Sequence, residues 1–475
     1  MKFFIECTQT YDTKFNSGIQ RVVRSIVRSA MAPENAQQAI PVIFDSGKFV
    51  GLKTAIPFPD DQQAVAGLTA TLSGPAKTTV KSRLHALTAI LARAIPAPAF
   101  VRFLYAPRNQ FGLAGIVYFP SQLRKWVRGE KVPNLHADVT LEHGDVLVLL
   151  DSSWNTSMWD TVDACRRRGV FVVVVIYDLI PLLHPRFCTP SVVHAFTGWL
   201  GKAVMRADAL IGISHTIAID IQRDLGRFLD MPQPLPRISY FWLGSELDGD
   251  CGDQQRVGPD LLAVCASERP TYVYVSTIEP RKNHGYALAA FDALWRSGVA
   301  ANFVIVGRIG WHCADFVREV HGHEQYGKQL FMFNNVDDNG LAHIYATVRG
   351  LIFTSFAEGF GLPVIEGLQR GLPVFASDIA VFREIGQSGV HFVDLADPAS
   401  LADALATHIR TGAQRLAEPV AWLTWQQSLQ QLQARIGECI AAQHSCAGEI
   451  VHRAASPSDM LIADTSAIPT PLLQN

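Results

Sequence analysis

Short apolar runs rich in β-branched residues alternate with helical patterns along most of the chain. Such alternation is typical of parallel βαβ units, whose strands are buried on both faces. Strands are predicted at 2–6, 40–44, 145–150, 170–176, 209–213 and 237–241, and again at 271–276, 302–306, 329–333, 351–354, 373–376 and 390–394. Helices are predicted between them at 19–31, 155–168, 190–206, 216–229, 283–297 and 363–370. The pattern predicts an α/β protein with two Rossmann-like, doubly wound sheets that face a central ligand-binding cleft.

Changes in composition predict the boundaries of these domains. The polar, Asp- and Gly-rich stretch 246–270 is typical of a linker between an N-terminal domain (1–245) and a C-terminal domain (271–420). An amphipathic helix is predicted in the segment 421–440, beginning with Trp422 and Trp425 and crossing between the domains. Residues 441–475 lose this periodicity and gain Ser, Thr and Pro, so we expect a disordered tail.

A basic segment interrupts the N-terminal domain. The region of about 52–140 is predicted to be an insertion, and its part 76–131 holds ten Lys or Arg against one acidic residue. Aromatic and leucine side chains are interspersed among these cations. This composition predicts contact with an anionic membrane surface. The alternative is a helical hairpin whose basic face serves only solubility.

Composition excludes several classes of protein. The 475 residues carry 41 Lys or Arg and 43 Asp or Glu, a formal charge of −2, which argues against a nucleic-acid-binding protein. Eight cysteines show no C-x-x-C spacing, which fits a reducing compartment rather than a disulfide scaffold or zinc ribbon. Glu6 comes too early for a signal peptide, and no apolar run approaches the ~20 residues that span a bilayer. We therefore expect a cytoplasmic enzyme.

The strongest chemical motif is FAEGFGLPVIEGLQRG at residues 356–371. A glycine loop with Gly359 and Gly361 leads from a strand into a helix, where backbone N–H groups and the helix N-terminus attract phosphate. Glu366, expected in the first helical turn, can accept hydrogen bonds from two ribose hydroxyls. Glu358, eight residues earlier, is placed for sugar hydroxyls or a developing positive charge. The alternative is that both carboxylates only cap the loop and the helix.

A second motif, YVSTIEPRKNH at residues 274–284, also joins a strand end to a helix. Arg281 and Lys282 lie at the start of that helix, where cations suit a diphosphate leaving group, and Asn283 is the expected N-cap. A solvated turn with a surface lysine is the alternative.

With these motifs the sequence resembles the retaining nucleotide-sugar glycosyltransferases of the GT-B fold, family 4, over residues 1 to about 435. The elements YDLIPLLHP (177–185) and SGIQRVVRSI (17–26) resemble bacterial mannosyltransferases that build O-antigen or exopolysaccharide. The resemblance implies that Lys282 neutralises the donor diphosphate with Arg281 as partner. Many relatives have Arg at the position of Thr277, which leaves open the cation that shares the β-phosphate.

The resemblance assigns further donor contacts. Glu366 is expected to hold the donor ribose and Glu358 the hydroxyls of the transferred sugar. The loop Gly359-Phe360-Gly361 is expected to bring backbone amides near the sugar and the phosphate. No metal or other cofactor is implied.

The N-terminal domain supplies fewer candidates. Gly18 permits close approach of a donor phosphate or an acceptor, and Arg21 either faces the cleft or covers the helix surface. Many relatives have a His where this chain has Tyr177, and tyrosine is a poor base at neutral pH. Asp178 either takes the role of base or caps the turn before Pro181. A cleft role for His184 is the less favoured of its two interpretations, the other being a buried, backbone-bonded residue.

Other chemistries lack their residue patterns. No DxD motif follows a strand in a nucleotide site, no His/Cys cluster has metal-ligand spacing, and no G-x-S-x-G occurs. We expect a retaining enzyme that transfers a hexose, foremost mannose from GDP-mannose, to a lipid-linked glycan at the inner face of the plasma membrane. The alternatives are a UDP-sugar donor, an epimerase or phosphorylase of the same fold, and a non-catalytic scaffold that docks to membranes.

Overall fold

The computed structural model describes residues 1–13, 18–57, 136–232, 235–246, 257–334, 336–386, 389–412 and 415–449. The chain divides into two compact units, residues 1–56 with 138–475, and residues 57–137. The basic segment 76–131 lies outside the described residues, as do residues 450–475 of the expected tail. The first unit, with the first two residues of the strand at 136–138, holds the elements of the fold.

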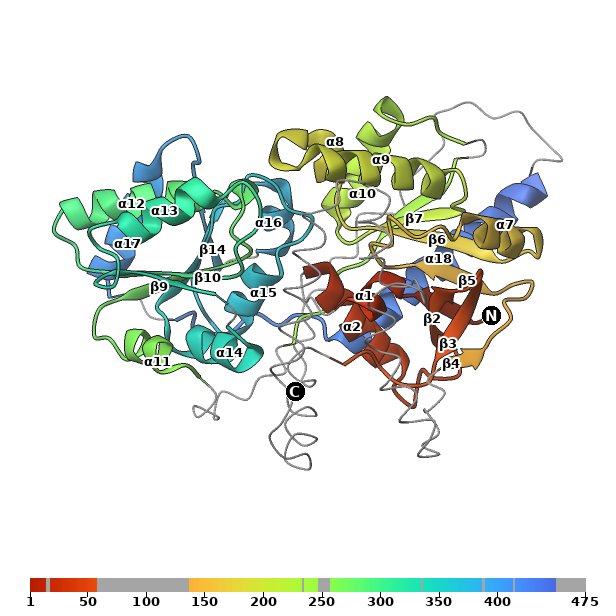
Figure 1. Ribbon diagram of the computed structural model, residues 1–475, viewed down its shortest axis with the longest axis horizontal. Helices are drawn as coiled ribbons and strands as arrows, with labels where there is room; N and C mark the ends of the chain where they lie inside the picture. Colours follow the sequence, from red (N-terminus) through yellow and green to blue (C-terminus); the bar gives the residue numbers. More distant parts are fainter. Residues whose placement is uncertain are drawn as a thin grey trace, which may run out of the picture. The chain divides into compact units, whose positions relative to one another are not determined.

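The N-terminal part of this unit is an eight-stranded sheet in the order β4-β3-β2-β1-β5-β6-β7-β8 (Figure 1). The strands β1, β2 and β5 to β8 run parallel, and β3 returns antiparallel to β2. From β1 the sheet grows in one direction through β2 to β4 and in the other direction from β5 to β8. The strand order therefore reverses between β1 and β5. The strands are β1 (Phe3–Glu6), β2 (Ala39–Asp45), β3 (Lys48–Leu52), β4 (His136–Asp138), β5 (Val146–Leu149), β6 (Phe171–Ile176), β7 (Ala209–Gly212) and β8 (Arg237–Tyr240).

Helices cover both faces of this sheet, which explains its continuous apolar strands. The four valines 172–175 of β6 are almost completely buried, as expected for a central parallel strand. Figure 1 shows α9 and α10 on one side of β6 and β7. The helices are α1 (Thr8–Asp12), α2 (Gly18–Ala30), α7 (Trp159–Arg167), α8 (Ile180–Leu183), η1 (Pro185–Phe187), α9 (Pro190–Val204), α10 (His215–Asp224) and η2 (Leu225–Arg227).

The C-terminal part is a six-stranded, wholly parallel sheet in the order β11-β10-β9-β12-β13-β14. Here the strand order reverses between β9 and β12. The strands are β9 (Thr271–Val275), β10 (Asn302–Val306), β11 (Leu330–Phe333), β12 (Gly350–Phe353), β13 (Val374–Ser377) and β14 (Val390–Val393). The two doubly wound sheets that the sequence predicts are thereby confirmed.

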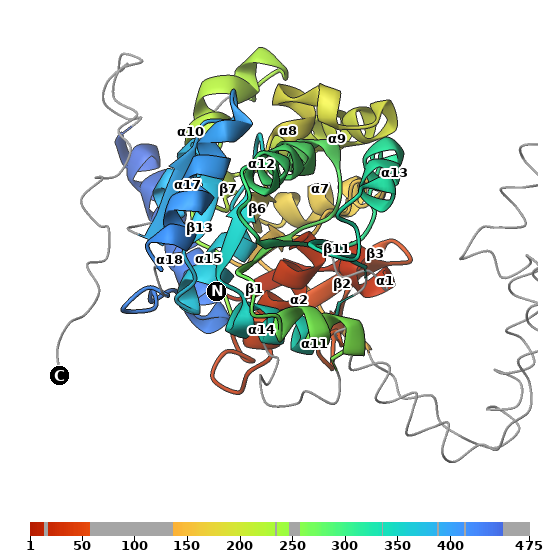
Figure 2. The ribbon, with the colours of Figure 1, turned by 90° about the vertical axis from the view of Figure 1, so that its left-hand side faces the viewer.

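Two layers of helices enclose the C-terminal sheet. Figures 1 and 2 show α12, α13 and α17 on one face, and α11 and α14 on the other. These helices and turns are α11 (Pro259–Cys265), η4 (Pro280–Lys282), α12 (His284–Arg296), α13 (Ala314–Gly322), α14 (Asp338–Thr347), α15 (Leu362–Gln369), α16 (Ala380–Ile385) and α17 (Pro398–Arg410).

The last helix, α18 (Trp425–Glu449), returns the chain to the N-terminal part, where it packs against α2 and β8. Trp425, Leu429, Leu432 and Ile436 are buried, as the amphipathic pattern predicts. The helix is longer than expected, because it continues through the first nine residues of the predicted tail. The prediction of disorder from residue 441 is therefore wrong up to Glu449.

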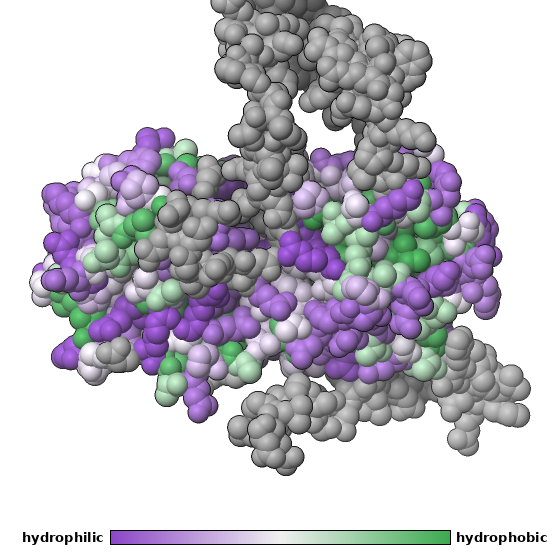
Figure 3. Space-filling view, turned by 90° about the horizontal axis from the view of Figure 1, so that it is seen from below, coloured by the Kyte–Doolittle hydropathy of each residue, from purple (hydrophilic) through white to green (hydrophobic). Residues whose placement is uncertain are grey.

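Several short elements were not predicted. The strand β3 ends where the expected insertion begins, β4 falls inside that insertion, and α11 falls inside the expected linker 246–270. A strand of three to five residues that contains Gly51, or a helix of seven, is too short to show a period. No helix among the described residues is both long and apolar enough to cross a bilayer. The surface in Figure 3 mixes hydrophilic residues with separate hydrophobic areas.

Candidate active site

The site begins with the loop between β12 and α15, which holds Glu358 in a buried ion cluster. One carboxylate oxygen, Oε2, lies 2.8 Å from Nη1 of Arg281, and the other, Oε1, accepts a hydrogen bond from Nζ of Lys282. Burial alone would raise the pKa of Glu358, but the charges of Arg281 and Lys282 outweigh it and lower this pKa to about 2. Glu358 is therefore ionised at neutral pH.

Arg281 and Lys282 come from the short turn η4, which follows β9. Arg281 also donates to the carbonyl of Ala357 (2.6 Å) and to Oε1 of Glu279 (2.7 Å), which fixes the guanidinium. Burial, and then the charge of Arg281, lower the pKa of Lys282, whereas Glu358 opposes this shift. Two cations thus lie at the carboxyl ends of β9 and β12, where the strand order reverses and ligands of doubly wound sheets bind.

Asn283 lies at the predicted N-cap position, but the capping hydrogen bond expected from its side chain is absent. Asn283 occupies the cap position of α12, but its backbone is left-handed (φ 56°) and its side chain makes no capping hydrogen bond. The 3-10 turn of η4 leads into the helix through this conformation, which asparagine adopts more readily than most residues.

Glu366 lies deeper in α15 than expected. The helix begins at Leu362, so Glu366 is its fifth residue rather than a member of the first turn. Its Oε1 lies 2.5 Å from Nη1 of Arg21, and its Oε2 accepts a hydrogen bond of 3.0 Å from the Tyr345 hydroxyl. Of the two interpretations of Arg21, the structure supports the one in which its side chain points toward the C-terminal part, because it pairs with Glu366. Both oxygens expected to bind ribose are occupied by protein groups.

The glycine loop is packed against the N-terminal part. A Cβ atom on Gly359 would lie 2.0 Å from the Tyr177 carbonyl oxygen, so only glycine fits there. The Gly359 carbonyl also accepts a hydrogen bond of 3.0 Å from Ser214. Gly361 has φ +113°, a conformation that glycine favours, and Phe360 is buried in the core. The backbone of Gly359 therefore contacts protein, and Phe360 does not face the cleft.

Tyr177 and Asp178 follow β6 on the opposite side of this contact. Asp178 accepts a hydrogen bond of 3.0 Å from the N–H of Ile180, so it does cap the turn before Pro181. Burial raises the pKa of Asp178, and the nearby charge of Arg281 opposes this rise. Asp178 thus holds its turn and faces the ion cluster as well.

The remaining candidates lie at the periphery of this cluster. Thr277 is half-buried after β9, and its side-chain methyl group lies against Gly310. His184 is half-buried, with its ring centroid 6.2 Å from that of Phe187. A Cβ atom on Gly18 would meet no other atom within 4 Å, so the described structure shows no close approach that requires this glycine.

Sequence reasoning missed two residues that join the parts of the site. The Tyr345 hydroxyl holds Glu366, and Glu384 accepts hydrogen bonds from the backbone N–H groups of His215 and Thr216 (2.8 Å each). Tyr345 lies 21 positions from Glu366, and Glu384 lies 169 positions from His215, so no local motif points to either residue. The described residues contain no group of three or more His, Cys, Asp or Glu that could hold a metal ion. The metal-free mechanism stays a prediction.

Comparison with known proteins agrees with this geometry. Residues 264–417, which contain Glu358, Glu366, Arg281 and Lys282, match the family model described as "Glycosyl transferases group 1". This part of the chain is therefore similar to a group 1 glycosyltransferase domain. The resemblance to this family that the two carboxylates and the cation pair indicate is thereby confirmed for residues 264–417.

Curated relatives and one solved structure extend the similarity. The chain is 36% identical to the serotype-specific mannosyltransferase WbdA of Escherichia coli over 301 residues, which are 61% of this chain and 37% of that protein. It is 31% identical to the O-antigen chain mannosyltransferase B of Escherichia coli over 144 residues, 30% of this chain and 36% of that protein. The chain therefore spans little more than a third of each relative.

The fold is shared with a sucrose-phosphate synthase from Thermosynechococcus elongatus. Its structure covers 93% of this chain and all of its own, with a TM-score of 0.55 and 14% identity. At that identity the similarity concerns the fold alone. The predicted GT-B architecture of two Rossmann-like domains is confirmed.

Proposed function

We propose that the chain is a retaining mannosyltransferase that transfers mannose from GDP-mannose to a growing surface polysaccharide. The observation that carries this proposal is the ion cluster of Glu358, Arg281 and Lys282 at the point where the strand order of the C-terminal sheet reverses. Similarity to a serotype-specific mannosyltransferase and to an O-antigen chain mannosyltransferase supports the choice of sugar. The donor would lie over β9 and β12, with its diphosphate near the two cations and the start of α15.

The transfer exchanges one bond at the anomeric carbon for another. The oxygen of an acceptor hydroxyl bonds to C1 of the sugar on the face that the diphosphate leaves, and the C1–O bond to the diphosphate breaks. The leaving diphosphate takes the proton of the acceptor hydroxyl. The protein has to hold two substrates and stabilise charge on the diphosphate, which Arg281, Lys282 and the α15 N-terminus are placed to do.

Donor binding requires three ion pairs to change. Glu358 now neutralises Arg281 and Lys282, and a diphosphate would share these cations while Glu358 meets sugar hydroxyls. Glu366 has to release Arg21 before it can accept hydrogen bonds from the ribose.

The proposal is tested with purified full-length protein, a synthetic mannoside acceptor, and GDP-mannose, UDP-glucose or UDP-galactose as donor. Transfer from GDP-mannose with an α-linked product by NMR is the expected result, because the sugar in GDP-mannose is itself α-linked. Glu358→Ala should abolish it, and Glu438→Gln, exposed on α18, serves as control. Transfer from a UDP-sugar instead would show that GDP-mannose is the wrong donor. Absence of transfer from every donor would favour a non-catalytic scaffold.

We also propose that no metal takes part. Two protein cations and a helix N-terminus already oppose the charge of a diphosphate. Transfer should therefore persist in EDTA, and its loss in EDTA with recovery in Mg²⁺ or Mn²⁺ would refute the metal-free mechanism.

We further propose a lipid-linked acceptor and attachment to the inner face of the plasma membrane through residues 76–131. The support is the local excess of cations in that segment. Changing Arg93, Arg102, Arg124 and Lys125 to Glu should release the protein from vesicles that contain anionic phosphatidylglycerol. Unchanged sedimentation with these vesicles would contradict the proposal.

A further inference from the structure

A second cluster of polar side chains lies at the carboxyl ends of the N-terminal strands, where the strand order of that sheet reverses between β1 and β5. Glu6 is the last residue of β1, and Asp151 comes two residues after β5. Doubly wound sheets bind ligands at this position. In the C-terminal sheet the same position holds the ion cluster of Glu358, whereas the proposed function gives its N-terminal counterpart no role.

Both carboxyl groups are buried, and Oε2 of Glu6 has no hydrogen-bond partner among the described residues. Oε1 of Glu6 accepts hydrogen bonds of 2.8 Å from the N–H of Thr8 and from the Ser153 hydroxyl. Asp151 accepts bonds from the N–H groups of Thr10 (2.5 Å) and Ser152 (2.7 Å). Burial and then the charge of Asp151 raise the pKa of Glu6 to about 7. Such a site repels anions, so the diphosphate of the donor does not belong here.

Three buried polar atoms of this cluster have no hydrogen-bond partner among the described residues. They are Oε2 of Glu6, the Thr10 hydroxyl and the Tyr177 hydroxyl. Tyr177 follows β6, which lies beside β5 in the sheet, and burial, then the charges of Asp151 and Glu6, raise the pKa of its hydroxyl group. Buried polar atoms are paired in most native structures, so three unpaired ones together indicate a place for a small hydroxylic ligand.

We propose that Glu6, Thr10 and Tyr177 form a subsite for a hydroxyl group of the acceptor sugar. This inference rests on the proposed function. A sugar hydroxyl donates to a carboxylate and both accepts from and donates to hydroxyls, which matches these three atoms. Tyr177 directly precedes Asp178, which faces Arg281, so the subsite adjoins the place proposed for the transferred sugar.

The contact between the two parts at Gly359 involves the backbone of Tyr177, a member of the subsite. The Gly359 Cα lies against the Tyr177 carbonyl, and Ser214 bonds the same glycine. The acceptor enters when this contact opens, and closure then holds its hydroxyl against the cluster.

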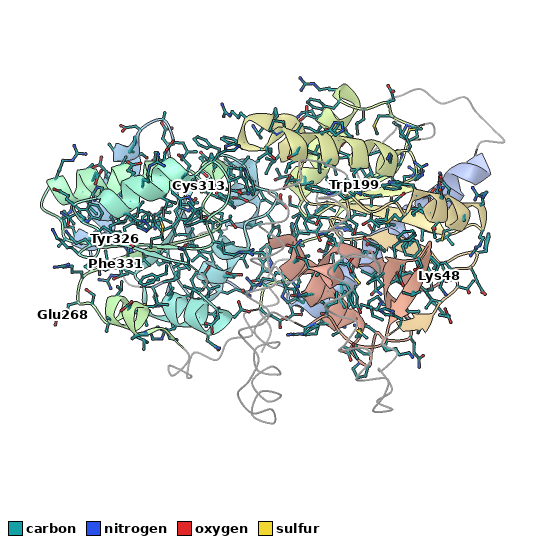
Figure 4. The ribbon with its side chains drawn as sticks, in the orientation of Figure 1. Lys48, Trp199, Glu268, Cys313, Tyr326 and Phe331 are labelled. Atoms are coloured by element: carbon teal, nitrogen blue, oxygen red, sulfur yellow. The ribbon has the colours of Figure 1, made fainter. Side chains whose placement is uncertain are left out.

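The test is Tyr177→Phe, which removes only the unpaired hydroxyl. With saturating donor, we expect the acceptor KM to rise about 5- to 10-fold, as the loss of one hydrogen bond predicts, with the donor KM changed less than twofold. The melting temperature of the ligand-free protein should stay equal or rise, because the lost hydroxyl had no partner. Thr10→Val should act in the same direction. The control is Tyr326→Phe, on the exposed tyrosine that Figure 4 labels near β11.

A series of monodeoxy acceptors identifies the bound hydroxyl. The deoxy acceptor that lacks the bound hydroxyl should have the same KM with wild type and with Tyr177→Phe. In both combinations the hydrogen bond between that hydroxyl and Tyr177 is absent. An unchanged acceptor KM in Tyr177→Phe with active wild type would overturn the subsite and leave the proposed function standing. Absence of transfer by wild type would instead refute the proposed function and the subsite with it.

Discussion

Arg21 on α2 and Glu366 on α15 form an ion pair that joins the N-terminal and C-terminal parts, with 2.5 Å between Nη1 and Oε1. Glu366 is almost fully buried, and Arg21 also reaches the carbonyl of Glu246 at 3.4 Å. The carboxylate proposed to bind the ribose is thus held by the protein itself when no donor is bound.

This pair predicts an effect of Arg21 on donor affinity. Because Glu366 must release Arg21 before it accepts ribose hydroxyls, Arg21→Met should tighten GDP binding about tenfold, ~1.4 kcal/mol, by calorimetry. The melting temperature of the ligand-free variant should fall, since Glu366 then stays buried without its cation. Arg410→Met, exposed at the end of α17, is the control. Weaker GDP binding would place Arg21 on the diphosphate instead.

Lys282 should matter for turnover more than for folding. Its ammonium is buried beside Glu358, and Arg281 remains to hold that carboxylate when Lys282 is removed. Lys282→Ala should lower kcat about 100-fold or more, as the loss of one group that stabilises a developing charge does. Transfer kinetics measure this, with Lys328→Ala on the surface for comparison. A near-normal kcat would remove Lys282 from the diphosphate site.

Gly359 should tolerate no side chain. The Cβ of Gly359→Ala would meet the backbone carbonyl of Tyr177 at 2.0 Å, and backbone cannot rotate away as a side chain does. We expect kcat/KM to fall at least tenfold with the fold retained, because the two parts can no longer close on the substrates. Gly437→Ala, whose Cβ would meet nothing within 4 Å, should leave activity intact and stabilise α18 slightly. Full activity of Gly359→Ala would mean that this contact is not part of the catalytic state.

The pKa of Glu6 predicts a pH dependence of stability. This pKa is about 7 in the folded protein against 4.5 in the unfolded chain. The folded state therefore binds the proton more tightly, and the free energy of unfolding falls as pH rises from about 4.5 to 7, by up to about 3 kcal/mol. Glu6→Gln cannot ionise, so its stability relative to wild type should increase between pH 5 and pH 8 in urea titrations. A difference that does not change with pH would contradict the raised pKa.

Sequence predicted most of the architecture and the chemistry on each strand end. The central strands are continuous apolar runs, as in β6, so the sequence predicted their positions and approximate lengths. The pairs Glu358 with Glu366 and Arg281 with Lys282 are local motifs, and one of the two interpretations offered for Arg21 holds. Short elements such as β3 and α11 gave no periodic signal.

Contacts between distant segments were not predictable in the same way. Tyr345 reaches Glu366 from another helix, and Glu384 meets His215 across 169 positions of the chain. The packing of Gly359 on Tyr177 depends on how the two parts meet, which no local pattern records. Glu6 is a carboxylate at the end of a buried strand, which the sequence does show. Its place in a polar cluster became evident only from the nearby Asp151 and Tyr177.

The central claim is that Glu366 lies in the nucleotide site, and a thermal-shift titration with GDP, UDP and ADP and their sugar conjugates tests it most directly. A ligand at one hundred times its Kd stabilises the folded state by about 2.7 kcal/mol. We predict a rise in melting temperature with GDP and GDP-mannose in wild type and in Glu438→Gln, and its loss in Glu366→Ala. An equal rise in Glu366→Ala, or none with any nucleotide in wild type, would contradict the account.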